Sequence, residues 1–164
     1  MPSRIWKTSW KHGPAARSTG LGPAVIVSVT EFVTHRPWGT PAVAAEGLRL
    51  RRGWPQTSGA VAIRLWMDTG LRLNRSGSVT VWTDEASLSA FVARPDHARV
   101  VRAFRGRGVM RSALTEIAPA GLSAAPPAAA SDPSAAPSGP SAGSGLAPAW
   151  AYAERILTGT EPWS

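Results

Sequence analysis

The chain contains no cysteine, which excludes disulfide bonds, thiolate catalysis, cysteine-ligated zinc and iron–sulfur clusters. It also has no long apolar run. The longest, from Ala24 to Val29, is far shorter than the roughly 20 residues of a membrane-spanning helix. The first 23 residues lack the apolar core of a secretory signal. From these absences we expect a soluble, cytoplasmic protein without a membrane span.

Lysine is nearly absent, although the chain is basic. The net charge is +8, yet only Lys7 and Lys11 are lysines, so the excess is arginine. Clustered basic side chains attract nucleic acid because they neutralise phosphates and release counterions. A GC-rich coding sequence also produces abundant Ala, Arg, Gly and Pro, and no zinc finger, basic zipper or helix-turn-helix motif is present. A basic nucleic-acid-binding protein is therefore the weakest of three functional hypotheses.

One low-complexity segment divides the chain. Residues 119–148 are dominated by Ala, Pro, Ser and Gly and contain one charged side chain, Asp132, and no aromatic one. Such a segment cannot bury enough apolar surface to offset the entropy of ordering it, which predicts a disordered linker. The rest divides into an extended arm over 1–23, one domain over 24–118 and a short helical segment over 149–164.

Both terminal segments carry large apolar side chains. We expect Trp6 and Trp10 of the arm to pack against the domain. The C-terminal segment offers Trp150, Tyr152, Ala153, Ile156 and Leu157. Their spacing predicts a short helix that docks on the domain or on its dimer mate. An independent interaction motif is the alternative.

The domain alternates between strand and helix patterns. Strands are predicted over 24–33, 60–67, 78–82 and 109–117, and helices over 40–54, from 84 to the break before Pro95, and over 95–104. Thr83 or Asp84 can cap the second helix, and Pro95 interrupts it because proline has no N–H to donate. The order β-α-β-β-α-β is the split pattern of a ferredoxin-like α+β fold.

Strand alternation gives the predicted sheet two different faces. We expect the helices to cover the more apolar face, formed by Val25, Val27, Val29, Val61, Ile63, Leu65, Val79 and Val81. The opposite face would carry Ser28, Thr30, Arg64, Trp66, Thr80 and Trp82. Because that face is too apolar in places to be left in water, a partner sheet from a second copy is its simplest cover. The sequence thus predicts a homodimer.

One stretch has a recognisable order of features: a strand ending in Val-Trp, an acidic helix start, and an apolar residue followed three positions later by an aromatic one. These features are Val81, Trp82, Asp84, Glu85, Leu88 and Phe91. The stretch resembles the dimeric α+β barrel superfamily, which includes antibiotic-biosynthesis monooxygenases, haem-degrading monooxygenases and the carotenoid-modifying spheroidene monooxygenase. The closer likeness is to short spheroidene-monooxygenase-like proteins with a Pro-x-His element, here Pro95 and His97. The resemblance covers about 24–117 and implies a dimeric α+β barrel.

The resemblance does not extend to the haem-degrading site. Those relatives use an Asn on the first strand, a Trp in the helix after the Val-Trp strand and an iron-ligating His ten residues later. The corresponding positions hold Ser28 or Thr30, Phe91 and Val101. Haem degradation of that type is therefore not expected, although His97, one helical turn before Val101, leaves a haem-ligand role open.

The candidate catalytic residues are His97 and Arg64. Histidine is a suitable general base near neutral pH, and an arginine can polarise a carbonyl or enolate oxygen. The candidate substrate-binding residues are Trp66, Trp82, Phe91 and Thr80. Each has a structural alternative: His97 as a packing residue bonded to a backbone carbonyl, Arg64 in an ion pair with Asp68, and the tryptophans in a dimer interface. The histidines have no metal-ligand spacing, so no protein metal site is expected.

Three functions remain from the sequence. The first is a monooxygenase-like protein that acts on a hydrophobic or aromatic small molecule of polyketide or carotenoid type, in a pocket between sheet and helices. The resemblance implies either no cofactor, with a substrate carbanion reducing oxygen, or haem. The second is a small-molecule-binding or structural dimer without catalysis, and the sequence does not decide between it and an enzyme. The third is the nucleic-acid binder.

Overall fold

The computed structural model describes residues 5–17, 21–70, 73–119 and 144–163. Most of the predicted disordered linker lies outside these residues. None of the helices in the described part of the chain is long and apolar enough to cross a membrane.

The centre of the molecule is an antiparallel sheet in the order β1-β4-β5-β3-β6, with β2 also paired to β4. Its strands are β1 (Ile5–Lys7), β2 (Lys11–His12), β3 (Val25–Thr34), β4 (Ala60–Asp68), β5 (Arg75–Trp82) and β6 (Gly108–Ile117). The helices are α1 (Thr40–Arg52), α2 (Glu85–Val92), α3 (Pro95–Phe104) and α4 (Ala147–Leu157). Short 3-10 turns are η1 (Pro14–Arg17), η2 (Pro37–Gly39), η3 (Trp54–Gln56) and η5 (Ser144–Leu146). From β3 to β6 the order is the predicted β-α-β-β-α-β, so the ferredoxin-like fold is confirmed.

Local sequence signals place the helices near the site. The Asp84 side chain accepts a hydrogen bond from the Ser87 backbone N–H at 2.7 Å and caps α2. Arg94 is extended, because the residue before a proline is driven out of helical geometry, and Pro95 then opens α3 as its first residue. The predicted break is therefore present, and it turns α3 relative to α2.

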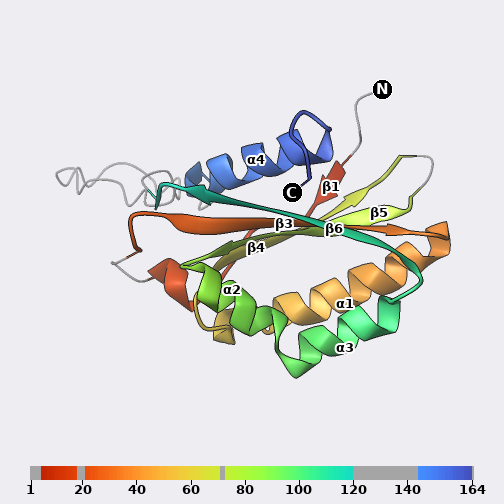
Figure 1. The fold of residues 1–164 in the computed structure, drawn as a ribbon, viewed down its shortest axis with the longest axis horizontal. Coiled ribbons are helices and arrows are strands. Elements are labelled where there is room, and N and C mark those ends of the chain that lie inside the picture. Colours follow the sequence, from red (N-terminus) through yellow and green to blue (C-terminus); the bar gives the residue numbers. More distant parts are fainter. Residues whose placement is uncertain (1–4, 18–20, 71–72, 120–143, 164) are drawn as a thin grey trace, which may run out of the picture.

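Helices lie on both faces of the sheet. Figure 1 shows α1, α2 and α3 on one side and α4 alone on the other. The α4 side is a packed hydrophobic core, and its sheet residues are Val25, Val27, Val29, Val61, Ala62, Trp66, Val79, Val81 and Ala113. The α4 residues Ala149, Trp150, Tyr152, Ala153, Ile156 and Leu157 pack against them. The structure thus docks the C-terminal segment on the chain's own sheet.

The predicted faces of the sheet were right for Ile63, Leu65, Arg64 and Trp66 of β4, but wrong for β3 and β5. Thr80 pairs with Ser28 on one side and Ile63 on the other, so these three side chains share the face under α1–α3. The valine rows of β3 and β5 face α4 instead. A β-bulge between Ala60 and Ala62 shifts the alternation of β4, which is why Val61 and Ile63 do not share a face. Because side chains alternate with period two, such a one-residue offset moves a whole row to the other face.

A polar network ties the end of α4 to the sheet. Glu31 of β3 is 2 % exposed and pairs with Arg75 of β5 at 2.7 Å. The same guanidinium donates to the backbone carbonyl of Leu157, the last residue of α4, at 3.2 Å. Tyr152 donates its hydroxyl to the Leu114 carbonyl of β6 at 3.3 Å. The partner sheet predicted for this face has no room, because α4 already covers it.

Candidate functional site

The α1–α3 side of the sheet is hollow. A cavity of about 770 Å³, here called the helix-side cavity, lies between these helices and the sheet. Neither α2 nor α3 has a fully buried residue, and the only one in α1 is Thr40. The apolar stripes of the helices therefore face open space where a closed core would have packed side chains. Such a cavity is large enough for a small organic ligand.

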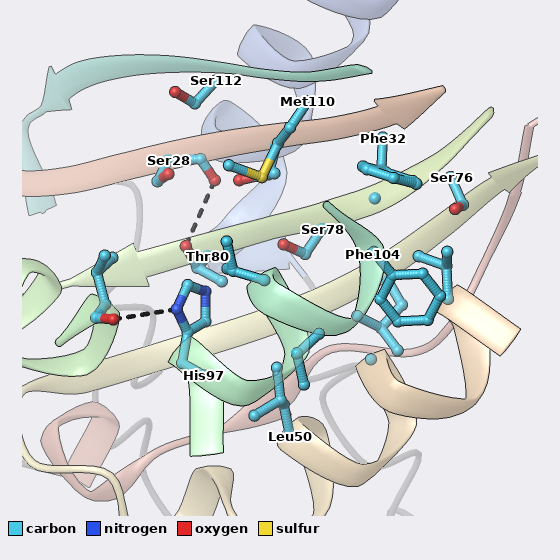
Figure 2. Close-up of a pocket in the computed structure, with 18 of the residues that line it drawn as sticks. Ser28, Phe32, Leu50, Ser76, Ser78, Thr80, His97, Phe104, Met110 and Ser112 are labelled. Carbon is cyan, nitrogen blue, oxygen red and sulfur yellow. Dashed lines mark hydrogen bonds between the residues drawn. The ribbon is translucent and has the colours of Figure 1, made fainter. Parts of the chain in front are cut away.

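The floor of the helix-side cavity carries a row of hydroxyl side chains on three neighbouring strands, beside apolar side chains such as Ile63 and Leu65 of β4. The hydroxyl side chains are Ser28 and Thr30 of β3, Ser76, Ser78 and Thr80 of β5, and Ser112 of β6. The roof is apolar and includes Val43, Leu50, Leu88, Phe91, Val100, Val101 and Phe104. Figure 2 shows residues of both surfaces. Only Thr80 was predicted as a site residue, although the alternation of Ser76, Ser78 and Thr80 is a signal for one shared face.

The hydroxyls differ in what they already bind. Thr80 accepts a hydrogen bond from Trp82 Nε1 at 2.9 Å and donates to the Ser28 carbonyl at 3.4 Å, so it is part of the protein's own network. Ser76 is 3 % exposed, and its Oγ has no hydrogen-bond partner among the described residues. A buried hydroxyl without a partner costs free energy that a bound polar group would recover. Ser76 Oγ is thus an unused hydrogen-bonding group in the cavity lining.

His97 is held by the break between α2 and α3. In an unbroken helix the Val92 carbonyl would accept a backbone N–H from residue 96, but α2 ends at Val92 itself. His97 Nδ1 lies 3.1 Å from that carbonyl oxygen, as the dashed line in Figure 2 shows. A carbonyl only accepts, so Nδ1 carries the proton and a neutral His97 keeps its Nε2 lone pair free. The predicted alternative, a histidine bonded to a backbone carbonyl, is present and leaves one nitrogen for a ligand.

An aromatic cluster packs against the ring of His97. The ring centroids of Phe91 and His97 lie 5.0 Å apart, those of Phe91 and Trp82 5.1 Å, and those of Trp82 and Trp54 4.9 Å. Phe91 lines the helix-side cavity, and its contact with a substrate stays a prediction. Trp82 is fully buried and does not line it, so its predicted place at the substrate is corrected: it packs under Phe91.

Arg64 lies on the other face of the sheet. Its guanidinium carbon is 4.6 Å from the Trp10 ring centroid and 5.3 Å from that of Trp150 in α4, and burial lowers its pKa. Trp66 belongs to the core beneath α4, although it also borders the cavity beside Gly77. The prediction that Arg64 joins His97 at one pocket is therefore corrected. The ion pair with Asp68 that was the structural alternative for Arg64 is formed by Arg75 instead, at 3.9 Å.

The described residues contain no group of three or more His, Asp or Glu side chains placed to hold a metal ion. His97 is the one described histidine that lines the helix-side cavity, so it would be the residue that holds a haem iron there. The imidazole of His97 is a suitable type of ligand for haem iron, and this is the one feature of the cavity lining that fits haem.

Comparison with known proteins supports the fold. No family model matches the chain, and no curated protein is similar to it in sequence. A dimeric ferredoxin-like protein of unknown function from Jannaschia sp. CCS1 superposes with a TM-score of 0.50 at 14 % identity, over 57 % of this chain and 99 % of that one. SnoaB, a cofactor-independent oxygenase from Streptomyces nogalater, matches with a TM-score of 0.46 at 22 % identity, over 56 % and 90 % of the chains.

A proposed antibiotic biosynthesis monooxygenase from Deinococcus radiodurans matches with a TM-score of 0.47 at 10 % identity, over 56 % of this chain and 89 % of that one. Each likeness spans little more than half of this chain. At these identities the matches concern architecture and not chemistry. The fold expected from the sequence is therefore confirmed: the chain has a ferredoxin-like α+β architecture.

Proposed function

We propose that this protein is a monooxygenase that acts on a hydrophobic or aromatic small molecule bound in the helix-side cavity. The observation that carries the proposal is the hollow face itself, with an apolar roof, a hydroxyl floor and His97 at its border. An apolar cavity with a few convergent polar groups is the usual form of a small-molecule site. The reaction class comes from the sequence resemblance.

The residues present suit a reaction in which the substrate supplies the electrons. His97 Nε2 accepts a proton from an acidic C–H or O–H of the substrate, which leaves an electron-rich enolate or phenolate. Hydroxyls of the floor, such as Ser78, donate hydrogen bonds to the oxygen on which that charge develops. Molecular oxygen then oxidises a CH₂ carbon to a carbonyl: one oxygen atom enters the product and the other leaves as water. No further reductant is needed.

Haem is the alternative cofactor, and His97 would be its ligand. A titration of the purified protein with haem decides between the two chemistries. A Soret band that His97→Ala abolishes indicates a haem enzyme. The cofactor-free proposal predicts no such band.

Oxygen uptake with quinol, anthrone-type and carotenoid substrates tests the activity. We expect uptake that His97→Ala lowers at least tenfold and that Arg99→Ala, an exposed change on the same helix, leaves unchanged. Uptake that is equal in both variants contradicts the role of His97. Binding of these compounds without uptake would instead favour the second hypothesis, a binding protein without catalysis.

Homodimerisation stays part of the proposal, but on a different surface. β6 is an edge strand, and its Val109, Met110 and Leu114 are about half exposed. An unpaired edge with apolar side chains is a suitable surface for a second copy. Light scattering tests this: a mass of 17.2 kDa contradicts the dimer. Salt-sensitive retardation of DNA would favour the nucleic-acid hypothesis.

A further inference from the structure

One end of the helix-side cavity differs from the rest of its lining. The rings of Phe32 and Phe104 meet edge to face there, with centroids 6.0 Å apart. Ser76 pairs with Phe32 across β5 and β3 and adds its unpartnered hydroxyl. Figure 2 shows the three residues together, at a distance along α3 from His97. We call this group the aromatic end of the cavity.

Two guanidinium groups accompany the aromatic end. Arg105, the exposed residue after α3, borders the cavity. The Arg107 guanidinium carbon lies 5.9 Å from the Phe104 ring centroid. Neither arginine forms an ion pair with a carboxylate of the described residues, whereas Arg75, at the same end of β5, is neutralised by Glu31. The aromatic end therefore carries uncompensated positive charge.

The opposite end of the cavity has the opposite charge. Glu85, at the start of α2, borders the cavity near Leu114 and Thr115, towards the far end of β6. Among the described residues it is the one carboxylate in the cavity lining. A ligand with one anionic group would be repelled from Glu85 and attracted to the arginines. The charges at the two ends therefore favour one orientation of an anionic ligand in the cavity.

The turn beside the arginines is open to solvent. Gly106 has a φ of +78°, and a Cβ placed on it would meet no atom within 4 Å. An anionic group at the aromatic end can thus stay partly hydrated, which avoids the large penalty of burying a charge completely. The hydroxyl of Ser76 offers it one donor from the buried side.

We propose that the ligand of the helix-side cavity is an amphiphilic anion, an aromatic or other apolar body with a carboxylate or a similar acidic group at one end. The acidic group binds at the aromatic end, where Arg105 and Arg107 compensate its charge and Ser76 donates a hydrogen bond. The apolar body lies between the hydroxyl floor and the helices. This inference rests on the proposed use of the cavity as a binding site.

The spacing of His97 and Arg105 also gives an expected length for a ligand that reaches both residues. His97 and Arg105 are eight residues apart, which is about 12 Å along a helix at 1.5 Å per residue. The part of the ligand that reaches His97 is then the end opposite the acidic group, so the arginines would decide which carbon is presented to the base.

A matched pair of fluorescent probes tests the proposal. 8-Anilinonaphthalene-1-sulfonate and N-phenyl-1-naphthylamine share one ring skeleton, and only the first carries an anionic group. We expect wild-type protein to bind both. Arg105→Ala should weaken binding of the sulfonate about fivefold, which equals about 1 kcal/mol, and leave the neutral probe unchanged. Arg102→Ala, an exposed change on α3 outside the cavity lining, is the control and should affect neither.

Ser76→Ala separates a ligand-binding role of Ser76 from a purely structural one, because the two roles predict different changes in melting temperature and in sulfonate binding. Removing a buried hydroxyl that has no partner should keep or raise the melting temperature, while it weakens the sulfonate. Salt at 0.5 M should weaken the sulfonate alone, since exposed charges are screened. If both probes bind and no variant separates them, the anionic preference is wrong while the cavity proposal stands. If neither probe binds to wild-type protein, the proposed use of the cavity fails as well.

Discussion

Replacing Arg75 by alanine tests how α4 is held on the sheet. The change leaves Glu31, which is 2 % exposed, without its cation, and leaves the Leu157 carbonyl without a donor. Removing one partner of a buried ion pair costs about 3–5 kcal/mol. Arg75 itself is 31 % exposed, so we expect the low end, about 3 kcal/mol. The lost hydrogen bond to Leu157 adds about 1 kcal/mol.

Urea unfolding at pH 7, followed by tryptophan fluorescence, measures this loss. The matched control is Arg155→Ala, because Arg155 pairs with Glu161 at the surface, where the two side chains are 48 % and 37 % exposed. Such exposed pairs contribute about 0–1 kcal/mol. A second change, Glu31→Gln in the Arg75→Ala background, should restore part of the stability because it removes the orphaned charge.

The result that would refute this reasoning is a loss below about 1 kcal/mol for Arg75→Ala, equal to that of the control. The carboxylate of Glu31 would then be satisfied by something other than Arg75. A loss near 4 kcal/mol would be a large share of the total stability of a domain of this size. It would show that the last turn of α4 depends on this network.

Two further predictions concern local structure. Asp84→Ala should cost about 1 kcal/mol at pH 7, because the side chain caps α2. Hydrogen bonds from the Thr83 hydroxyl and the Ser87 backbone N–H lower the pKa of Asp84, so its contribution is present above the unfolded pKa of about 4 and is lost as pH falls through the lower folded value. Unfolding curves of both proteins between pH 7 and pH 2 check this, and a constant difference contradicts it. Gly77→Ala should abolish stable folding, because the new Cβ would overlap the Thr30 carbonyl oxygen, whereas Gly106→Ala has open space and should cost only about 1 kcal/mol for its positive φ. Equal melting temperatures for the two variants would show that β5 and β3 can separate.

The order of elements from β3 to β6 could be predicted because its signals are local, whereas β1 and β2 fall in residues expected to form an extended arm. The valine alternation of β3, the cap at Asp84 and the break at Pro95 each depend on residues close in sequence. The approximate position of a pocket between sheet and helices followed from the fold that these signals and the resemblance imply. The homodimer, the substrate class and the cofactor stay predictions.

The two sheet faces could not be assigned from sequence because register is not local. Which residues of β4 share a face with Thr80 of β5 depends on the pairing register and on a bulge near Ala60, and nothing in the alternation of β4 marks that bulge. A row of serine and threonine side chains on one strand face also predicts a surface that faces solvent or a partner. Here they line a hollow interior, while the valine row expected under α1–α3 packs under α4.

The central claim is that the helix-side cavity binds a small molecule, and a blocked cavity tests it most directly. Ala44 of α1 lines the cavity, whereas the adjacent Ala45 is exposed, so Ala44→Trp and Ala45→Trp place the same bulk inside and outside it. Titration with N-phenyl-1-naphthylamine should show saturable binding to wild-type protein and to Ala45→Trp, and at least tenfold weaker binding to Ala44→Trp. Equal binding by both variants, with both folded by circular dichroism, would contradict the account.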